Sequence, residues 1–204
     1  MTRKLDYLRE SPSQTAGPYV HIGCTPNFTG IDIYGGDLGA AMKTGPVGGQ
    51  EITISGSVFD GMGTPLRDAM VEIWQPDANG FFASANETRG TADPNFTGWG
   101  RCAGDMDTGA FTFDTVKPGQ VPFPDGRMQA PHITFWVVAR GINIGLHTRM
   151  YFQDEEEANA ADPILSRIEH QNRIPTLLAV PTGTGAYRFD IHLQGPQETI
   201  FFDM

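Results

Sequence analysis

Cysteine is scarce in this sequence. The 204 residues include two, Cys24 and Cys102, which lie far apart and form no CxxC pair. A disulfide framework needs more cysteines, and a thiolate zinc site needs a local cluster. We therefore expect two free thiols. Long apolar runs are also missing: no stretch approaches the roughly 20 residues of a membrane span, and MTRKLDYLRE lacks the apolar stretch of a secretory signal. Together these absences predict a cytoplasmic protein.

Positive charge is in short supply. Lys and Arg number 14 against 24 Asp and Glu, which gives a formal net charge of −10, and no cluster of Lys or Arg stands out. Such a chain has no electrostatic reason to bind a nucleic-acid backbone. The acidic balance favours solubility over a binding role.

Short catalytic motifs are absent as well. The sequence has no HExxH, no GxSxG and no phosphate-binding GxxxxGK[ST]. Its five histidines stand alone, and a lone histidine in a strand is usually structural. The acidic run at residues 154–157 fits a solvated helix start better than an acid site. Local motifs therefore indicate no reaction.

Glycine and proline are abundant, with 25 and 15 residues, and favour many short strands joined by turns. Residues 1–50 show no sustained periodicity and predict an ordered, irregular arm without a helix, whose aromatic residues dock on a partner or interface. Residues 51–204 predict a β-sandwich domain. Alternating segments predict strands at residues 52–59, 69–75, 109–116, 132–139, 146–152, 186–194 and 198–202. Residues 91–102 are expected to be a loop, and Asn79-Gly80 predicts a turn. Residues 155–171 predict the one helical segment, which Pro163 divides. The fold class predicted from the residues is all-β, an antiparallel sandwich.

Longer motifs resemble a known family. SPSQTAGPYVHIG, GSVFDGMGTPLRDAMVEIWQPDANG, DPNFTGWGR, TVKPG, APHITFWVVARGINIGLHTRMYF and YRFDIHLQGPQETIFFD occur in this order along the chain. They resemble the alpha subunits of intradiol ring-cleaving dioxygenases of the protocatechuate 3,4-dioxygenase type. The resemblance implies the same β-sandwich and a hetero-oligomer of alpha and beta subunits. It also implies catechol ring opening with O2, on the route from protocatechuate through 3-carboxy-cis,cis-muconate to β-ketoadipate.

Catalytic subunits of this family hold a non-haem Fe(III) with two tyrosines and two histidines, a set of ligands suited to ferric iron. At the matching positions this sequence has Phe82, Val121, His132 and Thr134. No tyrosine occurs between Tyr34 and Tyr151, so a shifted alignment cannot restore the ligands. We therefore expect no metal site in this chain and an Fe(III) cofactor in the beta subunit. The alternative for His132 is a buried histidine that the backbone satisfies.

The resemblance implies that alpha residues wall part of the substrate pocket and are not catalytic. The matching positions are Thr15, Gly17, Pro18 and Arg140. An arginine offers bidentate hydrogen bonds to a carboxylate or sulfonate, so both protocatechuate and 4-sulfocatechol suit the site. Gly17-Pro18 could equally be a turn in a docking arm, and Arg140 could form a structural or interface salt bridge.

Two other functions remain open. The chain could be a stand-alone structural or binding sandwich in which the shared motifs serve the fold. It could also be a homomeric dioxygenase with unusual ligands, which would carry its own ferric iron. The missing tyrosines argue against the second.

Overall fold

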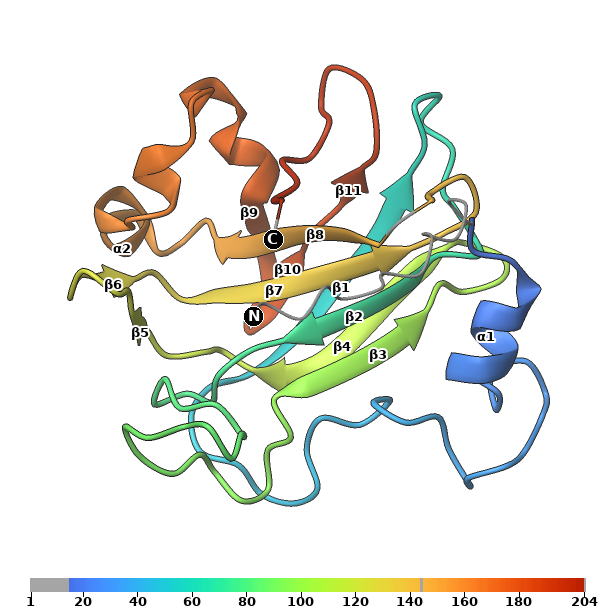
Figure 1. Cartoon of the computed structure of the whole chain (residues 1–204), viewed down its shortest axis with the longest axis horizontal. Coiled ribbons are helices and arrows are strands. Elements are labelled where there is room, and N and C mark those ends of the chain that lie inside the picture. The colour runs from blue at the N-terminus through green and yellow to red at the C-terminus, as the bar shows by residue number, and fades with distance from the viewer. Residues whose placement is uncertain (1–14, 144, 204) are drawn as a thin grey trace, which may run out of the picture.

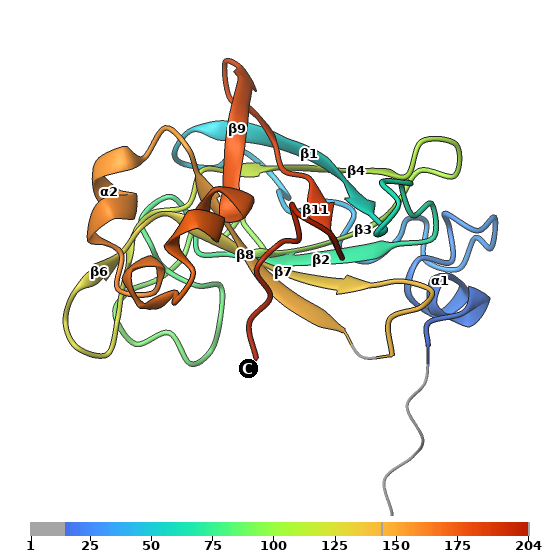
Figure 2. The same cartoon turned by 90° about the horizontal axis from the view of Figure 1, so that it is seen from above.

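The computed structural model describes residues 15–143 and 145–203, and these form a two-layer β-sandwich (Figures 1 and 2). The elements are α1 Pro18–Cys24, β1 Glu51–Phe59, β2 Met70–Trp74, β3 Trp99–Ala103, β4 Ala110–Val116, β5 Val121–Pro122, β6 Met128–Gln129, β7 His132–Val138, β8 Leu146–Phe152, α2 Glu156–Ala161, the 3₁₀ turns η1 Leu165–Arg167 and η2 Gln171–Leu177, β9 Leu178–Gly183, β10 Ala186–Arg188 and β11 Ile191–His192.

One strand, β9, connects the two layers. The first layer runs β3-β2-β7-β8 in antiparallel order, and the second contains β4, β1, β10 and β11. Leu178 and Ala179 of β9 pair with β8, whereas Val180 and Pro181 pair with β10. The β8–β9, β1–β10 and β1–β11 pairings are parallel. The predicted all-β sandwich is confirmed, and its sheet is mixed.

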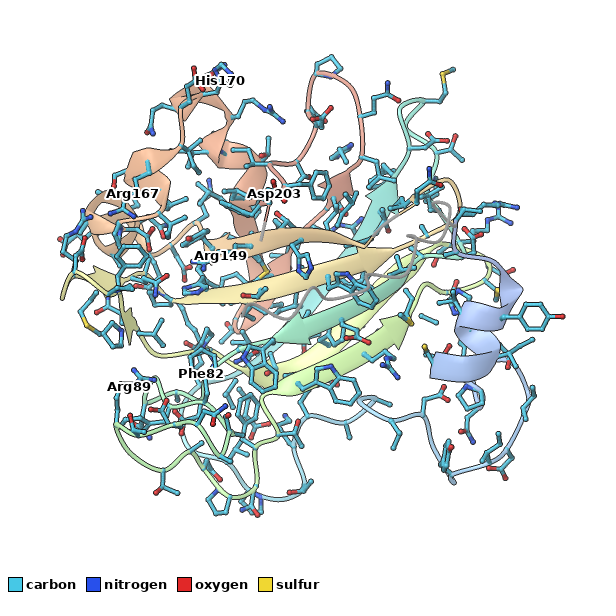
Figure 3. All side chains as sticks on the ribbon, in the orientation of Figure 1. Phe82, Arg89, Arg149, Arg167, His170 and Asp203 are labelled. Atoms are coloured by element: carbon cyan, nitrogen blue, oxygen red, sulfur yellow. The ribbon has the colours of Figure 1, made fainter. Side chains whose placement is uncertain are left out.

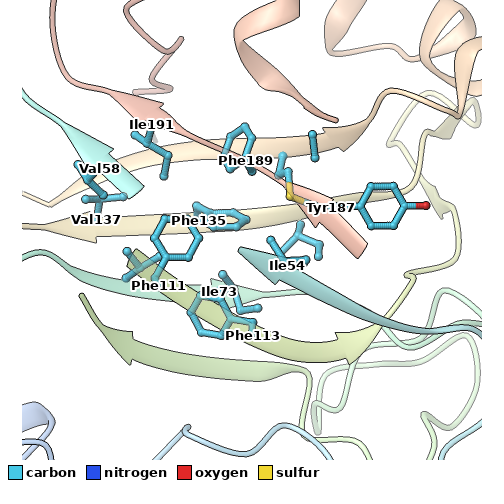
Figure 4. Packing of buried hydrophobic residues seen from close by; sticks show 14 of the residues in the cluster. Ile54, Val58, Ile73, Phe111, Phe113, Phe135, Val137, Tyr187, Phe189 and Ile191 are labelled. Atoms are coloured by element: carbon cyan, nitrogen blue, oxygen red, sulfur yellow. The ribbon is translucent and has the colours of Figure 1, made fainter. Parts of the chain in front are cut away.

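The core lies between the layers and follows from strand alternation. Ile133, Phe135 and Val137 of β7 are fully buried, while the residues between them face the other side of the strand. Phe113 meets Phe135 edge to face at 6.4 Å between ring centroids (Figure 4). Burying each such side chain contributes about 1.5–3 kcal/mol. The inner face of β7 therefore holds the fold together, which leaves its outer face for a site.

Most predicted strands are present, and three expectations need correction. The arm is not free of helix, because Pro18 takes the first helical position of α1, where its missing N–H costs nothing. Residues 99–103 form β3 instead of a loop, paired with β2. Residues 198–202 form no strand; Phe202 makes one isolated bridge to His147. The helical segment expected at 155–171 is divided at Pro163 as predicted, into α2 and the 3₁₀ turn η1.

The described part of the arm packs on the sandwich. Met42 is 2% exposed within the core cluster, and the Arg101 N–H donates to the Gly39 carbonyl at 2.9 Å. Residues 1–14 of the predicted arm lie outside the described residues. Cys24 and Cys102 are both free thiols. No helix among the described residues is long and apolar enough to cross a membrane.

Candidate functional site

Three neighbouring strands place a row of side chains on the outer face of the first layer. Trp74 of β2 lies opposite Thr134 of β7, which lies opposite Arg149 of β8. Residues paired across strands project to the same face. His132 and Tyr151 form the next pair along, so the row continues toward the end of β7.

The loop after β2 and the β5–β6 hairpin close over this row. Asp77 holds the loop after β2, since one carboxylate oxygen accepts the N–H groups of Asn79 and Phe81. Gly80 has φ +83°, the positive value expected of the Asn-Gly turn. The enclosed space is about 490 Å³. It is lined by Trp74, Phe82, Ser84, Asn86, Glu87, Thr88, Arg89, Val121, Pro122, Gln129, His132, Thr134 and Arg149. We call it the outer-face cavity; Figure 3 shows Arg149 on β8 and Phe82 and Arg89 on the loop after β2.

His132 is buried and neutral. Burial, reinforced by the nearby Arg149 charge, lowers the pKa of His132 to about 4. Its Nδ1 lies 2.8 Å from the Ala130 carbonyl, so Nδ1 carries the proton and donates, and Nε2 is left as an acceptor. Asp162 fixes this segment by accepting the Ala130 N–H at 2.8 Å. This geometry matches the alternative considered from the sequence, in which His132 is a buried histidine hydrogen-bonded to the backbone.

Glu87 and Arg89 neutralise each other at the cavity rim. Arg89 Nε donates to Glu87 Oε1 at 2.9 Å, and the Arg89 and Phe82 N–H groups donate to the same carboxylate. The side-chain hydrogen bond from Arg89 is the main cause that lowers the pKa of Glu87 to about 2. Arg89 also donates to the Gly80 carbonyl at 2.8 Å. This pair therefore adds no net charge to the cavity.

Arm residues and three loops between strands, which carry Asp68, Met106 and Arg140, enclose a second space of about 430 Å³, which we call the arm cavity. Its walls include Gly17, His21, Ile31, Asp68 and Arg140. The structure thus places Gly17 and Arg140, two of the predicted pocket residues, in one wall.

The other two predicted pocket residues lie close by in the chain. The Gly141 N–H donates to the Thr15 hydroxyl at 2.7 Å, so the arm is tied to the turn that carries Arg140. Pro18 follows Gly17 and begins α1.

Arg140 is mostly exposed. Its side chain is 77% accessible, and its Nε lies 3.3 Å from an oxygen of Asp68. An ion pair this exposed contributes about 0–1 kcal/mol. Most of the guanidinium's donors therefore remain open to a ligand or to another protein surface.

Comparison with known proteins identifies the family. The family described as "Dioxygenase" matches residues 26–195. The chain is 44% identical to the protocatechuate 3,4-dioxygenase alpha chain of Pseudomonas putida over 98% of both chains. It is 38% identical to the alpha chain from Burkholderia cepacia, over 97% of this chain and 98% of that one. The chain belongs to the intradiol dioxygenase family.

A beta chain and two solved structures are also similar to this chain. It is 32% identical to the protocatechuate 3,4-dioxygenase beta chain of Burkholderia cepacia, over 78% of this chain and 71% of that one. A 3-chlorocatechol 1,2-dioxygenase from Rhodococcus opacus 1CP has the same fold, with a TM-score of 0.60 and 20% identity over 76% of this chain and 64% of that one. A dioxygenase domain from Streptomyces sp. SirexAA-E gives a TM-score of 0.52 and 26% identity over 76% and 86% of the two chains.

The outer-face cavity does not suit the ferric iron of intradiol dioxygenases. All four positions matched to ligands in the sequence line it, and they hold Phe82, Val121, His132 and Thr134. The described residues contain no group of three or more His, Cys, Asp or Glu side chains that could hold a metal ion. Tyr151 offers no substitute, because burial raises the pKa of its phenol to about 12 and disfavours the tyrosinate. One imidazole beside a guanidinium does not stabilise a trivalent cation.

Sequence reasoning missed the charged lining of this cavity. Arg149, Gln129 and the Glu87–Arg89 pair were not among its candidate residues. HTRMYF was recognised as a strand, and counting two residues from Tyr151 puts Arg149 on the same face. Which neighbour faces that row depends on the β7–β8 register, which strand periodicity alone does not give.

Proposed function

We propose that this chain is the alpha subunit of a protocatechuate-type intradiol dioxygenase and binds no iron itself. The observation that carries the proposal is the outer-face cavity, where the family's ligand positions hold one imidazole, two apolar side chains and a threonine. The similarity to alpha chains over 97–98% of the sequence supports the same assignment. A beta subunit would hold the Fe(III).

The proposed contribution of this chain is to shape and orient, not to transfer protons or electrons. With its partner's iron, the complex would open a catechol ring between the two hydroxyl-bearing carbons and incorporate both atoms of O2. Arg140 would bind an anionic group on the ring opposite the diol through charge-assisted hydrogen bonds. Gly17, with no atom near the position of a Cβ, would let the arm backbone approach the ring.

Thr15 and Pro18 would keep that wall in place. The hydroxyl of Thr15 holds the turn of Arg140 through the Gly141 N–H, and Pro18 fixes the start of α1 directly after Gly17. We propose two parts of the chain: an arm at residues 1–50, which completes the interface, and a sandwich domain at residues 51–204. Protocatechuate and 4-sulfocatechol both fit an arginine at this place, and the proposed location is the cytoplasm.

The decisive experiment purifies the chain alone and also co-expressed with its beta partner. Iron content, the visible spectrum and O2 uptake with protocatechuate are measured for each. We expect iron, a ferric-tyrosinate band and ring cleavage in the complex and none of these in the single chain. Stoichiometric iron in the single chain would contradict the proposal that this chain binds no iron. A stable monomer that never forms a complex would favour the stand-alone binding sandwich.

A further inference from the structure

The outer-face cavity contains a positive charge, on Arg149, that forms no ion pair within the described residues. Arg149 Nη1 donates to Gln129 Oε1 at 2.9 Å, and its guanidinium lies 5.9 Å from the ring centroid of Phe202. Among the described residues no carboxylate forms an ion pair with it. A guanidinium has five N–H donors, so most of them are left for a ligand.

The other polar groups of the cavity add no net charge. The Glu87–Arg89 pair cancels, and His132 is neutral with Nε2 as an acceptor. Among the described residues that line the cavity, Arg149 therefore carries the charge that no ion pair cancels; the nearest buried carboxylate, Asp162, acts on His132 and Tyr151 from outside the lining. A site with one unpaired, half-buried cation favours a monoanion, because the anion's attraction offsets the desolvation cost of the buried charge.

Two aromatic rings, those of Trp74 and Phe82, form one wall of the cavity, and most of its other lining residues are polar. The rings of Trp74 and Phe82 lie nearly parallel, at 7° and 6.0 Å between centroids, and Trp74 is 40% exposed. Val121 closes another side as a buried apolar residue. A volume of about 490 Å³ admits a ligand with a single ring. The aromatic wall beside Arg149 favours a planar ring that carries a charged group over a hydrated inorganic anion.

We propose that the outer-face cavity binds a small aromatic carboxylate, with the carboxylate on the Arg149 guanidinium and the ring against Trp74 and Phe82. A hydroxyl on the ring would donate to His132 Nε2. The site lies within this chain, is distinct from the arm cavity and uses no metal. It goes beyond the proposed function, because it gives the chain a ligand of its own that requires no beta subunit.

Isothermal titration of the purified full chain with benzoate tests the proposal. A single-ring ligand held by one arginine is expected to bind with a Kd on the order of 0.1–1 mM. Neutral benzamide and inorganic phosphate should each bind at least about tenfold more weakly, because one lacks the charge and the other the ring. Phosphate binding as tightly as benzoate would replace the proposal with a general anion site.

Two variants locate the binding. Arg149→Gln should weaken benzoate binding at least about tenfold, the loss expected for a charge-assisted pair. Thr134→Leu should do the same by filling the floor between Trp74 and Arg149 while it leaves the guanidinium in place. The matched control is Arg188→Gln, which removes an arginine paired with Asp190 outside this cavity and should bind as the parent does.

Three results would overturn the site. They are unchanged binding in both cavity variants, equal binding of benzamide and benzoate, and no benzoate binding up to several millimolar. The urea midpoint of each variant is measured beside its titration, so that weakened binding is not confused with unfolding. Because the titration uses the single chain, it can fail while the alpha-subunit assignment stands, and the reverse is also true.

Discussion

Two arginines of this chain are in opposite electrostatic situations. Arg140 is 77% exposed at the arm cavity and has Asp68 within 3.3 Å, whereas Arg149 is half-buried on β8 and bonds to the neutral amide of Gln129. An exposed guanidinium stays hydrated when no ligand is bound, so it pays little desolvation free energy. A half-buried guanidinium without an anion loses part of its hydration without compensation. The first therefore suits reversible recognition at an interface, and the second suits a ligand held within the chain.

Replacing Arg140 tests its proposed role in substrate recognition. In the complex with the beta partner, Arg140→Ala should raise KM for protocatechuate about tenfold, the loss of roughly one charge-assisted hydrogen bond. KM for unsubstituted catechol should change less than about twofold, because that substrate has no anionic group for Arg140 to bind. Steady-state O2 uptake measures both.

Asp68→Asn is the matched control for Arg140. It removes the ion pair at 3.3 Å and keeps the guanidinium, so KM for protocatechuate should stay near the parent value. Equal effects of Arg140→Ala on the two substrates would remove the charge-recognition role. An effect of Asp68→Asn as large as that of Arg140→Ala would indicate a structural salt bridge.

At the scale of elements, periodicity predicted what local sequence controls. β1, β2, β4, β7 and β8 alternate clearly because one face packs on the core, and all five were predicted. β3 was missed because its sequence, WGRCA, lacks that contrast and its pairing with β2 decides it. The strand expected at 198–202 failed for the converse reason: Ile200, Phe201 and Phe202 are apolar, yet Phe202 forms no more than an isolated bridge to His147 and no ladder follows.

The residues of the outer-face cavity also divide into those that the sequence predicted and one that depends on tertiary structure. The resemblance supplied His132, Phe82, Val121 and Thr134, which line one cavity, but gave no reason to include Arg149. Arg149 enters through the register of β7 and β8, a long-range property. Strand alternation can give the face of a residue, and only the fold gives its neighbours.

Strand β1 depends on one glycine, which gives a prediction about the fold. A Cβ on Gly56 would lie 1.8 Å from the Phe189 carbonyl oxygen and 2.6 Å from the ring of Phe111. Gly56→Ala should therefore lower the free energy of unfolding by about 2–3 kcal/mol, the cost of overpacking a strand that has no room to move. Urea denaturation followed by circular dichroism measures the change.

Gly23→Ala is the control for this substitution. Gly23 lies in α1, and a Cβ there meets no atom within 4 Å. Alanine should leave stability unchanged or raise it by up to about 1 kcal/mol, because alanine favours a helix over glycine. Equal destabilisation by both variants would contradict the close approach of β1 to Phe189.

At the scale of the whole molecule, exposed apolar residues are concentrated in the arm. Seven of the twelve large hydrophobic side chains exposed among the described residues belong to one segment of it: Tyr19, Ile22, Phe28, Ile31, Ile33, Tyr34 and Leu38. The arm cavity opens on the same segment, through Ile22 and Ile31. So many exposed apolar side chains within one segment favour a contact with another protein. We therefore expect the proposed beta subunit to cover this segment, next to Arg140.

A double substitution in the arm tests that expectation. Ile33 and Leu38 are each 57% exposed, so Ile33→Ser with Leu38→Ser should leave the free energy of unfolding within about 0.5 kcal/mol of the parent. Association with the beta subunit should weaken at least about tenfold, since roughly 1.5 kcal/mol or more of apolar burial is lost. Size-exclusion chromatography of titrated mixtures measures the association. Met62→Ser is the control: Met62 is 90% exposed in the turn after β1, outside the arm, and its loss should not affect assembly. Weakening by Met62→Ser alone would move the contact from the arm to the turn after β1.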